Sequence, residues 1–114
     1  MMEMWTYRTT VVTEPATDLT GFKVEARDGS IGKVDESTAD AGKSYIVVDT
    51  GPWIFGRKVL LPAQTVERID LDAETVFVDR TKDEIKNAPE FDPEHGIEPR
   101  YQDELGGYYG QYYS

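Results

Sequence analysis

The segment from residue 22 to residue 79 is divided into short apolar runs by turn-forming residues, and this spacing limits the fold more than any other feature. The runs are rich in Val, Ile and Phe, and Gly, Asp or Pro separates them at intervals of about ten residues. Runs this short are typical of strands rather than of helices. We therefore predict about five or six strands, which cover 22–26, 31–34, 45–49, 58–61, 66–71 and 75–79.

Glycines predict how this sheet turns and bends. Asp28-Gly29 predicts a tight hairpin turn, because this pair supplies the positive φ angles that such turns need. Gly32 lies between Ile31 and Val34 and predicts a β-bulge there, which lets a small sheet curl. The run 45–49 is apolar on both faces and is therefore expected to be central. The fold class predicted is a small, mainly β barrel.

A short helix is predicted directly after the last strand. Thr81 and Glu84 have the Thr-x-x-Glu spacing of a capping box, in which each side chain satisfies a free N–H at the start of a helix. Pro89 prevents the helix from continuing, so we predict a C-terminal helix over 81–88 of two turns at most. Its small apolar face suggests a lid or plug at one end of the barrel.

Both ends of the chain lack this regular pattern. We divide the chain into an N-terminal arm (1–18), a barrel domain (19–92) and a flexible, acidic, Tyr-rich tail (93–114) that is disordered or loosely docked. Trp5 and Tyr7 could belong to an arm or an extra strand. The tail has three readings: an inert polymer, a segment that folds onto a partner or onto its own barrel, or an aromatic platform for bases.

Charge and composition exclude several classes of protein. The net charge of -10 disfavours binding to nucleic-acid backbones and to anionic membrane surfaces, where Lys and Arg supply most of the affinity. The absence of cysteine excludes disulfides, thiolate nucleophiles and zinc–cysteine sites. No apolar stretch approaches the roughly 20 residues of a membrane span, and no signal pattern opens the sequence. We therefore expect a cytoplasmic protein without a membrane span.

No residue pattern points to catalysis. His95 is the single histidine and lies among acidic residues without a visible scaffold, so we expect it to be exposed to solvent. The nearby acids Glu90, Asp92, Glu94 and Glu98 lack the spacing of a calcium loop and are expected to be solvated. The sequence therefore predicts no enzyme activity, no cofactor and no metal site.

Two apolar features remain as candidate contact sites. Trp53, Ile54 and Phe55 place three large side chains in a linker between strands. They could cap one end of the barrel, with Gly51 and Gly56 as hinges, or form an exposed hot spot for a protein partner, and both roles are compatible. The second feature is the tyrosine cluster of the tail, which consists of Tyr108, Tyr109, Tyr112 and Tyr113.

Several of these segments together resemble one known family. They are Leu19-Thr20-Gly21-Phe22-Lys23-Val24, Asp28-Gly29-Ser30-Ile31-Gly32-Lys33-Val34, Tyr45-Ile46-Val47-Val48-Asp49 and Val59-Leu60-Leu61-Pro62. In this order they resemble the PRC-barrel domain, above all its small stand-alone bacterial members, in which Pro89-Glu90-Phe91-Asp92 also recurs. The resemblance covers about 19–92 and implies a curled β barrel that acts as an adaptor on larger assemblies, without a shared enzymatic activity.

Our leading hypothesis is a noncatalytic adaptor that binds an unknown protein partner and forms a homo-oligomer. The alternative is an RNA- or ribosome-associated factor, implied by the ribosome maturation factor in the same family. That role needs a clustered basic face, for which the candidates are Lys23, Lys33, Arg57, Lys58 and Arg68. A sensor of a small molecule or metal is a third hypothesis.

Overall fold

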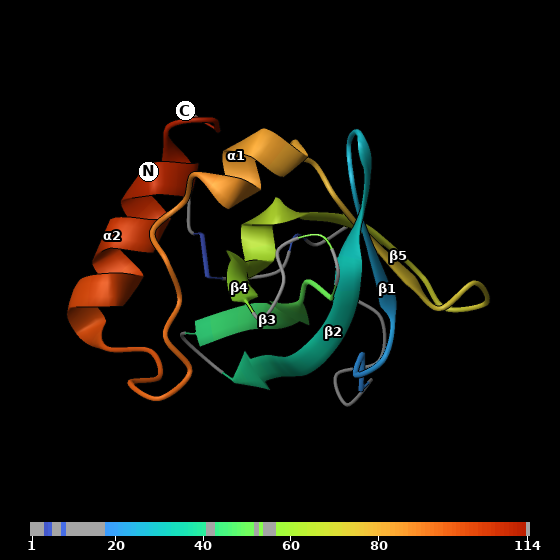
Figure 1. Cartoon of the computed structure of the whole chain (residues 1–114), viewed down its shortest axis with the longest axis horizontal. Helices are drawn as coiled ribbons and strands as arrows, with labels where there is room; N and C mark the ends of the chain where they lie inside the picture. Colours follow the sequence, from blue (N-terminus) through green and yellow to red (C-terminus); the bar gives the residue numbers. More distant parts are fainter. Residues whose placement is uncertain are drawn as a thin grey trace.

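Six strands form a single sheet in the computed structural model of the chain (Figure 1). The structure describes residues 4, 5, 8, 18–40, 43–51, 53 and 57–113, with the backbone alone for 38–40 and 43. The strands are β1 (Lys23–Ala26), β2 (Gly29–Asp40), β3 (Lys43–Asp49), β4 (Lys58–Pro62), β5 (Val66–Asp70) and β6 (Thr75–Val78). Their order in the sheet is β4-β3-β2-β1-β6-β5. The mainly β fold predicted from the sequence is confirmed.

The link between the two edge strands forces the sheet to curl. β4 and β5 lie at opposite edges of the sheet, yet only the short 3-10 helix η1 (Ala63–Thr65) connects them. Six flat strands would separate these edges by about 24 Å, and three residues span about 10 Å at most. The sheet therefore bends round into a barrel-like shape, although no ladder joins β4 to β5 in the part of the chain that the structure describes.

The turn and the bulge lie where the glycines predicted them. Gly29 has a φ of 142° at the β1–β2 turn, and Gly32 has a φ of 141°. The pairing of β1 with β2 shifts register beside Gly32, so that Ile31 is skipped. A Cβ atom at Gly32 would collide with the carbonyl oxygen of Asp49. Glycine therefore lets β2 approach β3 more closely than any other residue could.

The apolar core is formed by side chains of all six strands and of the segments that cover them. The largest fully buried side chains are Tyr109, Ile31, Ile46, Leu60, Leu61, Ile85, Leu105, Val24, Val48, Val66, Val76 and Val78. Both faces of β3 are buried, since Ile46, Val47 and Val48 are all covered. This confirms that the run 45–49 is central.

Helix α1 (Lys82–Lys86) begins with the predicted capping box. The Thr81 hydroxyl accepts the Glu84 N–H at 3.2 Å, and the Glu84 carboxylate accepts the Thr81 N–H at 2.8 Å. Ile85 is the buried residue of this helix and anchors it on the barrel.

The tail differs from the expectation of disordered or loosely docked coil. Residues Pro99–Gly110 form helix α2, in which Leu105 and Tyr109 are completely buried. Pro99 occupies the first turn, where its missing N–H costs nothing. Tyr101, Leu105 and Tyr109 follow at four-residue spacing and face the barrel, a helical period that the surrounding glycines and acids obscured. This helix corrects the prediction of a flexible tail.

Residues 4 and 5 belong to the core rather than to a free arm. The Met4 carbonyl accepts the Gln64 N–H at 3.0 Å, and the Trp5 carbonyl accepts the Ser44 N–H at 2.7 Å. The Trp5 ring packs edge-on against Tyr45, with 6.4 Å between ring centroids. A Cβ at Gly106 would lie 3.2 Å from the Trp5 indole nitrogen, so this glycine lets α2 pack closely on Trp5. Tyr7 lies outside the described residues.

None of the helices described here is long and apolar enough to cross a membrane. The division of the chain at residues 18 and 92 remains a prediction.

Candidate interaction surface

The four tail tyrosines have different environments. Tyr109 has no exposed surface, and its hydroxyl has no hydrogen-bond partner, so it is part of the core. Tyr108 donates to the Glu84 carbonyl at 2.6 Å, and Tyr113 donates to the Asp79 carboxylate. Tyr112 is 38% exposed. Of the four, Tyr112 thus offers the most surface to a partner.

Helix α1 brings the two predicted contact features together. Trp53 is half-buried, and the Lys82 ammonium lies 5.6 Å from the centre of its ring. Glu84 belongs to the same helix, and its carbonyl accepts a hydrogen bond from the Tyr108 hydroxyl. Ile54 and Phe55 lie outside the described residues. We call the set Trp53, Arg80, Lys82, Tyr108 and Tyr112 the α1 rim.

Tyr112 is held in one orientation by its neighbours. The Arg80 guanidinium lies 4.7 Å from the centre of the Tyr112 ring, and Tyr108 packs edge-on against Tyr112 with 5.8 Å between centroids. Arg80 is itself fixed, since it is only 9% exposed and its guanidinium lies 3.6 Å from the Glu84 carboxylate. The exposed aromatic ring therefore loses little freedom when a partner binds.

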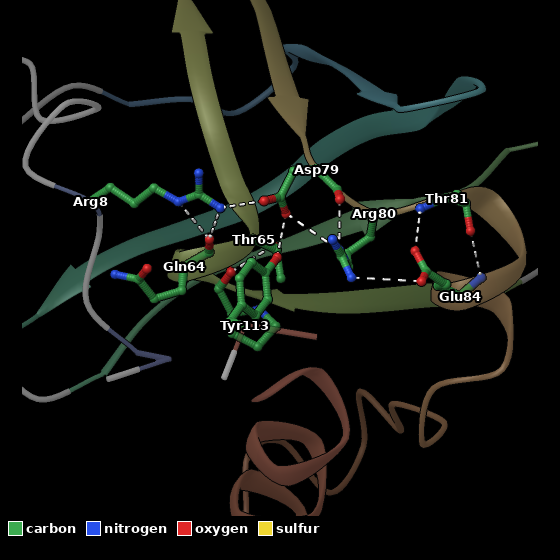
Figure 2. Close-up of polar contacts among 9 residues, drawn as sticks. Arg8, Gln64, Thr65, Asp79, Arg80, Thr81, Glu84 and Tyr113 are labelled. Carbon is green, nitrogen blue, oxygen red and sulfur yellow. Dashed lines mark hydrogen bonds and ion pairs between the residues drawn. The ribbon is translucent and has the colours of Figure 1, made fainter. Parts of the chain in front are cut away.

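A polar network connects Arg8 and Tyr113 to the barrel, and Figure 2 shows its members. Arg8 donates to the Asp79 carboxylate at 2.6 Å and to the Gln64 carbonyl at 2.8 Å. The same carboxylate accepts the Tyr113 hydroxyl, and the Arg80 side chain donates to the Asp79 carbonyl at 2.7 Å (Figure 2). Burial, aided by Asp79, raises the pKa of Tyr113 well above its usual range. Tyr113 is therefore a neutral hydrogen-bond donor at physiological pH.

A row of charged residues crosses the outer face of the sheet. Lys23 on β1 is the register partner of Lys33 on β2, which faces Asp49 on β3, which in turn faces Lys58 on β4. Directly opposite residues share a face of a sheet, so all four side chains point the same way. Lys58 is bonded to Asp35 at 3.0 Å. Among the described residues, no ion pair involves Lys23 or Lys33.

The row contains three of the five basic residues considered for RNA binding. The other two basic residues are not part of this row. The Arg57 guanidinium lies 3.8 Å from the Glu90 carboxylate, and the Arg68 guanidinium lies 4.0 Å from the centre of the Phe77 ring. A surface cavity of about 340 Å³ opens beside the row. It is lined by Lys23, Ser30, Gly32, Lys33, Asp49 and Gly51. Sequence reasoning missed this cavity, because it depends on strand register.

His95 is exposed, as predicted, and its Nδ1 lies 2.6 Å from an Asp92 carboxylate oxygen. Hydrogen bonds from the backbone N–H of Glu94 and from His95 lower the pKa of Asp92. Within the described ranges, no three His, Asp or Glu side chains are grouped so that they could hold a metal ion.

The architecture is that of a small, strongly curled β domain closed by two helices. The family model of the PRC-barrel domain matches residues 12–85, so the chain belongs to the PRC-barrel family. The resemblance noted from the sequence is thereby confirmed.

No curated protein matches the chain. Among similar solved structures is RimM from Pseudomonas aeruginosa, named as a candidate 16S ribosomal RNA processing protein, with 30% identity and a TM-score of 0.48. The match covers 57% of this chain and 42% of RimM, so the chain corresponds to less than half of that protein.

Proposed function

We propose that this PRC-barrel protein is a noncatalytic interaction module that associates with itself and binds other proteins through the α1 rim. The observation that carries the proposal is the exposure of Tyr112. Among the described residues, Tyr112 and Leu71 are the most exposed large hydrophobic side chains, at 38% and 45%. Of these two, Tyr112 is the one embedded in a group of aromatic and Arg side chains.

The composition of the α1 rim supports this role. Trp, Tyr and Arg are the residue types that contribute most often to hot spots in protein interfaces. Here Trp53, Tyr112 and Arg80 lie around one short helix and are already packed against neighbours, which lowers the entropy cost of binding. We propose that Ile54 and Phe55 also take part in partner binding, and that Tyr113 supports the α1 rim through its contact with Arg80.

Light scattering coupled to size-exclusion chromatography tests the proposal. The wild-type protein is expected to show a mass above that of the 12.9 kDa monomer, and Tyr112→Ala to shift the mass toward the monomer. Leu71→Ala is the matched control, because it removes the other exposed hydrophobic side chain at the β5–β6 turn, on the opposite side of the molecule from α2 (Figure 1).

An unchanged mass for Tyr112→Ala, or an equal loss for both variants, would contradict the role of the α1 rim. A wild-type monomer at every accessible concentration would contradict self-association. Urea unfolding of both variants shows that any change in mass does not come from unfolding.

A second candidate function is association with RNA or the ribosome. It is supported only by the neighbouring lysines Lys23 and Lys33 on the outer face of the sheet. Two unpaired ammonium groups would release about two counterions, so the affinity should fall only shallowly with salt. Co-sedimentation with ribosomes at low salt tests this candidate. Loss of binding in Lys23→Gln/Lys33→Gln would support it, and absence of the wild-type protein from all ribosomal fractions would exclude it.

A further inference from the structure

We infer that the cavity beside Lys23 and Lys33 is a binding site for a small phosphorylated alcohol, such as a sugar phosphate. This site lies on the outer face of the sheet and shares no residue with the α1 rim. It therefore goes beyond the proposed function and does not depend on it.

The first argument is electrostatic. Lys23 and Lys33 are exposed and lie directly opposite each other on neighbouring strands, where like charges repel. Five other cations among the described residues have a carboxylate partner, namely Arg8, Arg57, Lys58, Arg80 and Arg100. The described residues supply no such partner for Lys23 or Lys33. A bound anion would remove this repulsion and gain two charge-assisted hydrogen bonds.

The second argument is the shape of the site. Its volume of about 340 Å³ lies within the range of pockets that hold small molecules. Gly32 leaves backbone rather than side chain at the cavity wall, and no other residue fits there because its Cβ would collide with Asp49. Asp49 also accepts the Gly51 N–H at 3.0 Å, which fixes the edge of the cavity where β3 ends.

The donors and acceptors of the cavity define the ligand. A phosphate monoester carries nearly two negative charges at neutral pH, which matches two ammonium groups better than a single carboxylate does. Ser30 adds a hydroxyl donor. The carboxylate of Asp49 repels a second anionic group but can accept hydrogen bonds from hydroxyl groups. The site therefore favours one phosphate group joined to a hydroxyl-bearing body.

Titration of the full chain with ribose 5-phosphate, inorganic phosphate and ribose, followed by amide NMR, tests this inference. We expect saturable shifts of the Ser30, Gly32 and Gly51 amide signals with both phosphates and none with ribose. Ribose 5-phosphate should bind more tightly than inorganic phosphate, because it adds several sugar hydroxyl groups that can donate to Asp49. Asp49→Asn keeps the acceptor for Gly51 and should reduce this preference.

The variant Lys23→Gln/Lys33→Gln should weaken phosphate binding by about tenfold or more. Lys86→Gln, which removes an exposed ammonium group from α1, is the control and should bind as the wild type does. Shifts that do not saturate, or equal binding by the double variant, would overturn the inference. Tighter binding of a single-stranded RNA without terminal phosphate at the same amides would also overturn it, in favour of a nucleic-acid surface.

Discussion

Tyr113 donates a hydrogen bond to one carboxylate oxygen of Asp79, and Arg8 donates to the other oxygen at 2.6 Å. One side chain at the end of β6 therefore holds both the segment before the barrel and the segment after α2. The Arg8 guanidinium also lies 5.7 Å from the centre of the Tyr113 ring, so the two hydrogen-bond donors to Asp79 also form a cation–π pair with each other.

Replacing Asp79 with Asn should lower the free energy of unfolding by about 1–3 kcal/mol, because Arg8 loses its charged partner in a partly buried position. Urea unfolding measures this change. Asp72→Asn is the control at an exposed turn and should change stability by less than about 0.5 kcal/mol. A double-mutant cycle with Tyr113→Phe should give a coupling of about 0.5 kcal/mol or more, and a coupling of zero would contradict the network.

Two tyrosines of the same segment should respond oppositely to loss of the hydroxyl. Tyr109→Phe should leave stability unchanged or raise it by about 1 kcal/mol, because its buried hydroxyl has no partner. Tyr113→Phe should lower stability by about 1 kcal/mol, since Asp79 loses a donor. Thermal or urea unfolding compares the two variants. A larger loss for Tyr109→Phe than for Tyr113→Phe would show that the environments are assigned the wrong way round.

Two glycines should also differ in their tolerance of alanine. Gly32→Ala should cost about 3 kcal/mol or more, because the new methyl group collides with the Asp49 carbonyl and the φ of 141° strains any side chain. Gly107→Ala should stabilise α2 by about 0.5–1 kcal/mol, since its Cβ would meet no atom within 4 Å. Equal effects of the two substitutions in urea unfolding would argue against the close approach of β2 to β3.

The docking of α2 should weaken in alkaline solution. Burial, together with Tyr112, raises the pKa of Tyr108 to about 12, and burial also raises the pKa of Tyr101 and of Tyr113. A folded-state pKa above the unfolded value of about 10 means that folding favours the neutral phenol. This stability is fully present below about pH 10 and is lost as the pH rises toward 12 and beyond.

The unfolding free energy, measured against pH together with phenolate absorbance, checks this alkaline effect. The variant Tyr101→Phe/Tyr113→Phe should flatten the decline. An unchanged slope would show that these phenols do not govern the loss of stability.

The barrel could be predicted from the sequence because its signals are local. The Asp28-Gly29 turn, the bulge at Gly32 and the capping box of Thr81 and Glu84 each depend on residues within a few positions of one another. Helix α2 could not be predicted in the same way. Its glycines and acids are poor evidence for a helix, and it is held by tertiary contacts such as that of Gly106 with Trp5, a hundred positions earlier in the chain.

The candidate sites were only partly predictable for the same reason. The aromatic residues Trp53 and Tyr112 could be selected by type, but their common neighbour α1 became evident only in three dimensions. The pairing of Lys23 with Lys33 depends on a register that shifts at the bulge, and a slip of one residue would place either lysine on the other face. Burial of Tyr109 was likewise set by the packing of α2 rather than by its neighbours in sequence.

Arg8 and Tyr113 bind the same carboxylate, so two residues at nearly opposite ends of the sequence lie next to each other in space. A short peptide joining these two regions could replace the natural connectivity, and the chain could be reopened in the exposed turn 71–74 without cutting a strand. Such a circular permutant would keep every strand pairing of the sheet. The structure thus predicts that this barrel tolerates a different order of its strands along the chain.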